Sequence, residues 1–183
     1  MAEHIVKSYE SELAELDKKV GQMGGLAEQL LGDSFEALEQ RNAGLARTVV
    51  LNDRAIDQLH RELEEQVVTM IARRQPMAND LRQVMAVLKV AGDLERIGDL
   101  AKNIGKRAQA ISGENHPKPL ITGLSHMVEL TSRSLKDVLD AFAARDADKA
   151  LKVWREDEHI DALYNSLFRE LLTYMMEDPR NIG

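Results

Sequence analysis

Apolar residues recur at intervals of three and four along almost the whole chain, which is the spacing of one face of an α-helix. This pattern predicts five long helices, separated by glycines, prolines and polar residues, at about 13–38, 45–74, 76–111, 120–142 and 148–177. Composition agrees, because aromatic residues make up only 4% while Leu, Ala, Glu, Lys and Arg are abundant. Long helices joined by short turns pack as antiparallel bundles. The sequence therefore predicts an all-α fold.

The chain also contains an internal repeat. A shift of 104 positions overlays residues 23–79 on residues 127–183 without a gap, and fifteen of these 57 positions are identical. Two unrelated amphipathic helices could share apolar positions, but that would not explain a shared turn or matching aspartates. The repeat predicts two tandem units of antiparallel helices. The first three-helix unit covers residues 1–112, a linker covers 113–119, and the second covers 120–183 and lacks its third helix.

Three pairs of acidic residues stand four positions apart: Asp53/Asp57, Glu95/Asp99 and Asp157/Asp161. Like charges at this spacing repel each other on a helix. The first and third pairs occupy the same place in the two repeat units. We expect all three pairs to lie beside the apolar stripes, where carboxylates of neighbouring helices could converge. A bound cation would relieve their repulsion, and all-oxygen ligation suits Mg²⁺, Mn²⁺, Ca²⁺ or iron.

Less specific interpretations of the same acids stay open. Basic residues could neutralise them as ordinary salt bridges, the candidates being Arg54, Arg96, Lys102 and Lys106. His60 could join a ligand set three residues after Asp57, although its repeat equivalent is Tyr164. Glu156 and His159 form half of a carboxylate-bridged di-iron motif, which needs a second copy. Glycines 92, 98 and 105 read as positions where helices pack closely.

Other features narrow the class of protein. The net charge of −7 gives no attraction for nucleic acid, and the absence of cysteine excludes disulfides and thiolate chemistry. No apolar run approaches the ~18 residues of a membrane span, and the N-terminus lacks the apolar core of a signal peptide. The sequence carries no recognisable nucleophile motif or phosphate-binding loop. We therefore expect a cytoplasmic protein.

Two segments resemble a known family. Residues 75–104, QPMANDLRQVMAVLKVAGDLERIGDLAKNI, closely resemble the signature of the PhoU family of bacterial phosphate-uptake and phosphate-signalling regulators. Residues 155–182 look like the second PhoU repeat. The resemblance implies two tandem three-helix bundles whose acidic motifs hold metal ions. On this chain those motifs are Asp53/Asp57 with Glu95/Asp99, and Asp157/Asp161. The family's last motif has no residues here, so the second site would need acids from another chain.

The resemblance also implies a function. PhoU-like proteins are not enzymes, and they keep phosphate-starvation genes off when phosphate is plentiful. They link the ATPase subunit of the high-affinity phosphate transporter to a two-component sensor kinase, and would be peripheral to the membrane at most. The expected ion is iron, manganese, magnesium or zinc. The alternatives are a carboxylate-bridged metal enzyme and a metal-free helical scaffold.

A further expectation concerns self-association. The apolar stripe of the last helix would have nothing to cover it in a two-helix unit (Leu163, Leu167, Leu171 and Met175). Exposed stripes of this size usually find a partner, so the sequence predicts a homodimer or a larger assembly.

Overall fold

Five α-helices make up the fold seen in a computed structural model, which describes the backbone of residues 2–113 and 118–177 and the side chains of 9–113 and 119–177. No strand occurs in these ranges. The all-α prediction is confirmed, and the helix ends lie within a few residues of the predicted ones except for the start of the first helix, which is Ala2 and not about residue 13. The predicted linker falls mainly on 114–117, outside the described residues. The helices are α1 (Ala2–Glu39), α2 (Ala43–Arg74), α3 (Ala78–Ala110), α4 (Lys118–Ala144) and α5 (Ala147–Glu177).

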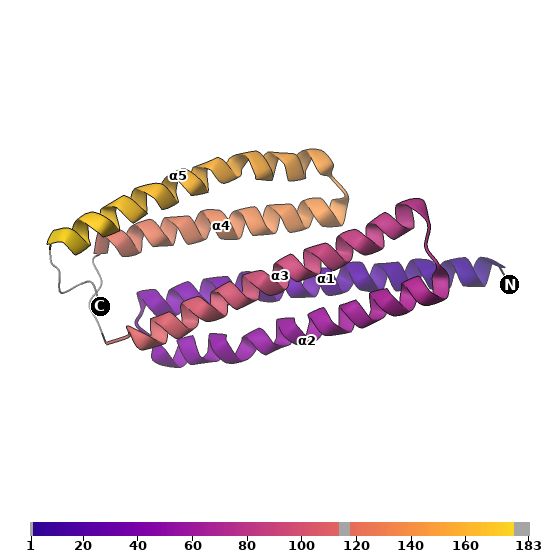
Figure 1. Ribbon diagram of the computed structural model, residues 1–183, viewed down its shortest axis with the longest axis horizontal. Helices are drawn as coiled ribbons and strands as arrows, with labels where there is room; N and C mark the ends of the chain where they lie inside the picture. Colours follow the sequence, from indigo (N-terminus) through magenta and orange to yellow (C-terminus); the bar gives the residue numbers. More distant parts are fainter. Residues whose placement is uncertain (1, 114–117, 178–183) are drawn as a thin grey trace.

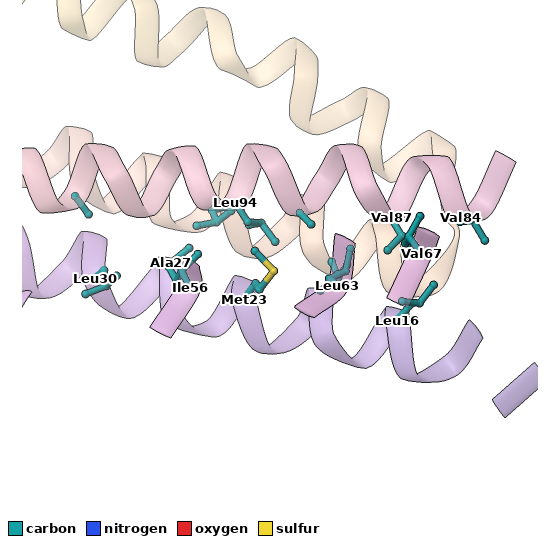
Figure 2. Packing of buried hydrophobic residues seen from close by; sticks show 14 of the residues in the cluster. Leu16, Met23, Ala27, Leu30, Ile56, Leu63, Val67, Val84, Val87 and Leu94 are labelled. Carbon is teal, nitrogen blue, oxygen red and sulfur yellow. The ribbon is translucent and has the colours of Figure 1, made fainter. Parts of the chain in front are cut away.

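The main hydrophobic core lies between α1, α2 and α3, each of which packs against the other two. Figure 2 shows side chains of all three helices meeting in the interior of this bundle, among them Met23, Leu63 and Leu94. These residues are at most 2% exposed. Burying one large aliphatic side chain contributes about 1.5–3 kcal/mol, so this three-helix core supplies a rigid frame for whatever its surface carries.

The second pair of helices lies along one side of this bundle (Figure 1). α4 packs on α1, and α5 packs on α4 alone among the described elements. Gly24 of α1 lies directly under Leu139 of α4, because a Cβ at position 24 would come within 2.6 Å of Leu139 Cδ1. α1 continues through Gly24 and Gly25 as one helix. The missing side chain at Gly24 is therefore what lets α4 approach α1.

The 104-residue repeat is visible in the two turns that join α1 to α2 and α4 to α5. Arg41 and Arg145 occupy equivalent positions and both adopt the left-handed conformation, with φ of 51° and 55°. The next residues, Asn42 and Asp146, each cap the following helix with a side-chain oxygen that accepts the backbone N–H three residues on, at 3.0 and 2.9 Å. The same local chemistry therefore sets both turns.

The outward face of α5 is unusually apolar. Val67 of α2 is 1% exposed in the core between α1, α2 and α3, whereas its repeat equivalent on α5, Leu171, is 40% exposed. Leu167 is buried against Gly123 of α4. Several large apolar side chains of α5 are open to solvent (Leu151, Trp154, Tyr164, Phe168, Leu171, Leu172 and Met176). Most of these side chains lie in the C-terminal half of α5, and such a group of exposed apolar residues is typical of an interface.

Candidate functional site

Asp53 is a buried carboxylate in the middle of α2. It is 1% exposed and occupies the core stripe itself, four residues after Val49 and three before Ile56, both fully buried. The prediction that every acid pair lies beside the stripe is therefore wrong for Asp53. The spacing from these two apolar neighbours places its side chain on the same helix face as theirs. Burying a carboxylate is costly unless it is paired with a cation and hydrogen-bonded.

Room for this carboxylate comes from Gly98 of α3. A Cβ at position 98 would lie 2.9 Å from Ile56 Cδ1 and 3.1 Å from Asp53 Oδ1. Gly105 similarly lies against α2, with the backbone oxygen of Ala46 3.2 Å from where its Cβ would be. The glycines at 98 and 105 are close-packing positions, as predicted. They allow the α3 backbone to come directly alongside the face of α2 that carries Asp53.

Lys102 of α3 supplies the cation. Its Nζ lies 2.5 Å from Asp53 Oδ2 on α2 and 2.5 Å from Asp99 Oδ1 one turn earlier on α3. The hydrogen bond to Asp53 is the main cause, and the one to Asp99 the second, of a pKa of Lys102 raised well above its usual 10.5. Lys102 therefore stays charged and bridges two helices. Of the basic residues proposed from the sequence to neutralise the acids, the structure assigns Lys102 to Asp53 and Asp99.

The second oxygen of Asp53 is left without a partner. Oδ1 is buried, and no donor within the described residues reaches it. An unsatisfied buried acceptor costs about 1–3 kcal/mol, and such a group in a native structure calls for an explanation. Asp53 therefore has spare capacity to bind a cation or a donor, next to an oxygen that already holds a positive charge.

The remaining predicted ligands are placed less closely together. Asp57 and Glu95 are half-buried, one turn from Asp53 and Asp99 on their respective helices. Asp157 and Asp161 on α5 are exposed, in contrast to Asp53, although they are the repeat equivalents of Asp53 and Asp57. Across the described residues, no group of three or more His, Cys, Asp or Glu side chains is close enough to hold a metal ion. The structure thus brings together two of the four acids expected in the first unit.

The two histidines considered as metal ligands, His60 and His159, contact groups other than the acid pairs. His60 Nε2 is 3.7 Å from Glu64 Oε1, on the same helix. Nδ1 of His159 lies 3.1 Å from the backbone oxygen of Glu156, on the exposed surface of α5. Each histidine thus has a contact within its own helix.

Comparison with known proteins gives the family. The family model described as the PhoU domain matches residues 20–108, which cover most of α1 to α3, and residues 124–182, which cover most of α4 and α5. The chain belongs to the PhoU family. The resemblance seen in residues 75–104 and 155–182 is therefore confirmed. None of the helices in the described part of this PhoU chain is long and apolar enough to cross a membrane.

Individual PhoU proteins are similar over nearly the whole chain. The phosphate-specific transport system accessory protein PhoU homolog of Rhizobium meliloti (strain 1021) is 49% identical over 98% of this chain and 76% of its own length. The phosphate-specific transport system accessory protein PhoU of Escherichia coli (strain K12) is 40% identical over 98% of this chain and 74% of its own length. The crystal structure of PhoU from Pseudomonas aeruginosa superposes with a TM-score of 0.91 at 39% identity, over 95% of this chain and 83% of that one.

The acid pairs of this PhoU chain fit a metal ion by donor type. Carboxylate oxygens are what hard cations prefer, and Asp53 Oδ2 and Asp99 Oδ1 already meet at one positive charge. The unpartnered Oδ1 of Asp53 is a further oxygen at the same place. Lys102 Nζ, however, occupies the point between the two carboxylates. A metal ion could bind there only if the lysine moved away, which its long side chain, 22% exposed, permits.

Sequence reasoning missed the burial of Asp53 and gave Lys102 no special place among four candidate cations. Both had a signal. Asp53 stands at i+4 from one apolar core residue and i−3 from another, and Lys102 stands at i+3 from Asp99, where helix side chains meet. Gly98 faces Asp53 across the helix interface, which no single-helix pattern reveals.

Proposed function

We propose that this protein is a cytoplasmic accessory regulator of phosphate transport and not an enzyme. When phosphate is plentiful it would act as a negative regulator of phosphate-starvation signalling. Its partners would be the ATPase subunit of the phosphate transporter and a two-component sensor kinase. Membership of the PhoU family supports the proposal, as does the similarity to relatives named phosphate-specific transport system accessory proteins. The acidic net charge of −7 argues against nucleic acid as a partner.

The observation that carries the metal-binding part of the proposal is the meeting of Asp53 and Asp99 on one ammonium group. We propose that iron, manganese, magnesium or zinc displaces Lys102 at this point, with Asp57 and Glu95 moving in from the neighbouring turns. A bound ion would supply a positive charge able to accept oxygen ligands from a partner. Lys102 would act as a built-in competitor that keeps the two carboxylates neutralised when metal is scarce.

The second acid pair, Asp157/Asp161, is proposed to bind metal only with acids from another chain, because both residues are exposed on α5. We also propose the division into a first repeat at 1–112 and a second at 120–183, joined by 113–119. The apolar face of α5 supports a homodimer, since large side chains such as Trp154 at 73% exposure and Met176 at 82% are otherwise open to water.

Metal content tests the site. Protein purified without chelator is analysed by inductively coupled plasma mass spectrometry as wild type, as Asp53→Asn/Asp99→Asn and as the matched control Glu64→Gln/Glu65→Gln, which removes two exposed charges from α2. We expect the first variant to lose metal and the control to retain it. Lys102→Met should retain more metal than wild type. Equal metal in both double variants would place the ion elsewhere.

Regulation is tested separately in bacteria that lack their own PhoU protein. A reporter under a phosphate-starvation promoter should be repressed in high phosphate when the wild-type chain is supplied, and derepressed with Asp53→Asn/Asp99→Asn. Repression unchanged by that variant would uncouple regulation from the acid pair. A complete lack of repression by the wild-type chain would contradict the proposed function itself.

A further inference from the structure

A groove of about 620 Å³ separates α3 from α4 on the side of the bundle away from Asp53. Both helices rest on α1, but within the described residues they make no close backbone contact with each other. Figure 1 shows that the two helices run in opposite directions. The lining of the groove is mainly apolar and comes from both walls, including Val90, Leu94, Ile97, Leu135, Val138 and Phe142.

The groove is long as well as apolar. Its lining on α3 runs from Asn79 to Ile97, which at 1.5 Å per residue is ~27 Å, or about five helical turns. The lining on α4 runs from Leu135 to Phe142, which is ~10 Å or two helical turns, and continues into the turn to α5. Two antiparallel helices with an apolar strip between them form the kind of groove into which a third amphipathic helix docks. The apolar part of the α3 wall runs from Ala86 to Ile97, so the apolar strip is about three turns long.

The charges at the rim of the groove indicate what kind of partner helix it would bind. Four aspartates line the groove against two arginines (Asp17, Asp80, Asp93 and Asp146; Arg82 and Arg145). Arg145 lies 3.9 Å from Asp17, and this pair adds no net charge, which leaves three aspartates against Arg82. Asp93 is exposed and has no ion-pair or hydrogen-bond partner within the described part of the chain. The rim is therefore net acidic, and it complements basic residues on a partner.

We propose that this groove is a docking site for an amphipathic α-helix of another protein, with an apolar stripe flanked by Lys or Arg. Such a helix would lay its stripe on the strip between α3 and α4 and place its basic flanks near Asp93 and the neighbouring acids. The site lies on the flank of α3 opposite to the one that carries Asp99 and Lys102. Helix docking is therefore separable from cation binding in any experiment.

The probe is a fluorescein-labelled 18-residue peptide of Leu and Lys, with the leucines at helical spacing on one face, measured by fluorescence anisotropy in 150 mM NaCl. Its matched control has the same composition in an order that gives no apolar face. Val138, 39% exposed in the groove, is changed to Asp, and Val68, 67% exposed on α2, is changed to Asp as the matched protein control. Both positions reach solvent, and circular dichroism verifies that both variants keep their helices.

We expect the striped peptide to bind at least tenfold more tightly than its shuffled control. Val138→Asp should weaken binding by tenfold or more, while Val68→Asp should change it by less than twofold. The direction of the change in affinity is informative. If the cationic peptide bound only by general attraction to an acidic protein, an added negative charge would strengthen binding instead of weakening it. Binding to Val138→Asp as tight as, or tighter than, to wild type would overturn the proposal.

The charge of the partner is tested by Asp93→Asn against the control Glu64→Gln, each of which removes one negative charge. We expect several-fold weaker binding for the first and less than a twofold change for the second. A peptide with Glu in place of Lys should fail to bind. If it binds equally well, or if oleate occupies the groove and displaces the striped peptide in a Val138-dependent way, the occupant is not a basic helix and the proposal is wrong.

Discussion

Replacing Lys102 with methionine removes the ammonium that Asp53 and Asp99 share but keeps most of the side chain's length and apolar stem. The two carboxylates differ in what they lose. Asp53 is 1% exposed and cannot turn to water, whereas the Asp99 side chain is 45% exposed and can. The cost of the substitution therefore comes almost entirely from Asp53.

The size of this cost follows from burial. Removing one partner of a buried ion pair costs about 3–5 kcal/mol, and an exposed pair is worth only about 0–1 kcal/mol. Because Lys102 is 22% exposed, the pair with Asp53 lies between these limits. We expect Lys102→Met to lower the free energy of unfolding by about 2–4 kcal/mol. For a chain of this size that corresponds to a melting temperature lower by roughly 5–15 °C.

Urea unfolding followed by circular dichroism measures the effect in metal-free buffer at pH 7. Lys106→Met is the matched control, since this lysine lies one turn further along α3, is exposed and makes no ion pair within the described residues. It should change stability by less than about 0.5 kcal/mol. The double variant Asp53→Asn/Lys102→Met should recover part of the loss, because it removes the buried charge together with its partner.

The same pair predicts a pH dependence. The raised pKa of Lys102 means that the folded protein holds this proton more tightly than the unfolded chain, mainly because of its hydrogen bond to Asp53. Its contribution to stability is therefore complete below pH 10.5 and is lost as the pH rises further towards the folded-state pKa. The gap between wild type and Lys102→Met should narrow in that alkaline range. A Lys102→Met protein no less stable than Lys106→Met at pH 7 would refute the reasoning.

Three further predictions concern packing and assembly. Gly98→Ala, whose Cβ would meet Ile56 at 2.9 Å, should destabilise by about 1–3 kcal/mol in urea unfolding, while Gly25→Ala, with open space around it, should stabilise by about 0.5–1 kcal/mol. Asp146→Ala should cost about 0.5–2 kcal/mol in the same assay through loss of the α5 cap. Light scattering at tens of micromolar should show a dimer that Leu171→Glu converts to a monomer. A monomeric wild type would contradict this last expectation.

Periodicity is sufficient to predict the helices and nearly all their ends, because the sequence of each helix displays an apolar stripe, whether the fold buries that stripe or, as on α5, leaves most of it exposed. The internal repeat is also predictable from the sequence, because its two units share the same local turn, in which Asn42 and Asp146 make equivalent capping hydrogen bonds. The contact between Asp53 and Lys102 could not be derived in this way. It depends on how close α3 comes to α2, which is set by Gly98 and by the packing of the whole bundle.

The position of Asp53 also shows what pattern reasoning overlooks. A charged residue in an apolar stripe looks like an interruption of that stripe, so the sequence predicts the acid at the edge of the stripe. In the fold Asp53 instead lies in the core, where it forms an ion pair with Lys102 of another helix, α3. The open groove between α3 and α4 is another product of assembly, because it exists only where two helices rest on α1 without reaching each other.

The central claim is that Asp53 and Asp99 hold one cation between α2 and α3, and that a metal ion can replace Lys102 there. Anomalous diffraction from crystals grown with Mn²⁺ measures this directly. We predict an anomalous peak within bonding distance of both carboxylates, with the Lys102 ammonium turned away from them. A peak confined to other positions, with Lys102 still bridging Asp53 and Asp99, would contradict the claim.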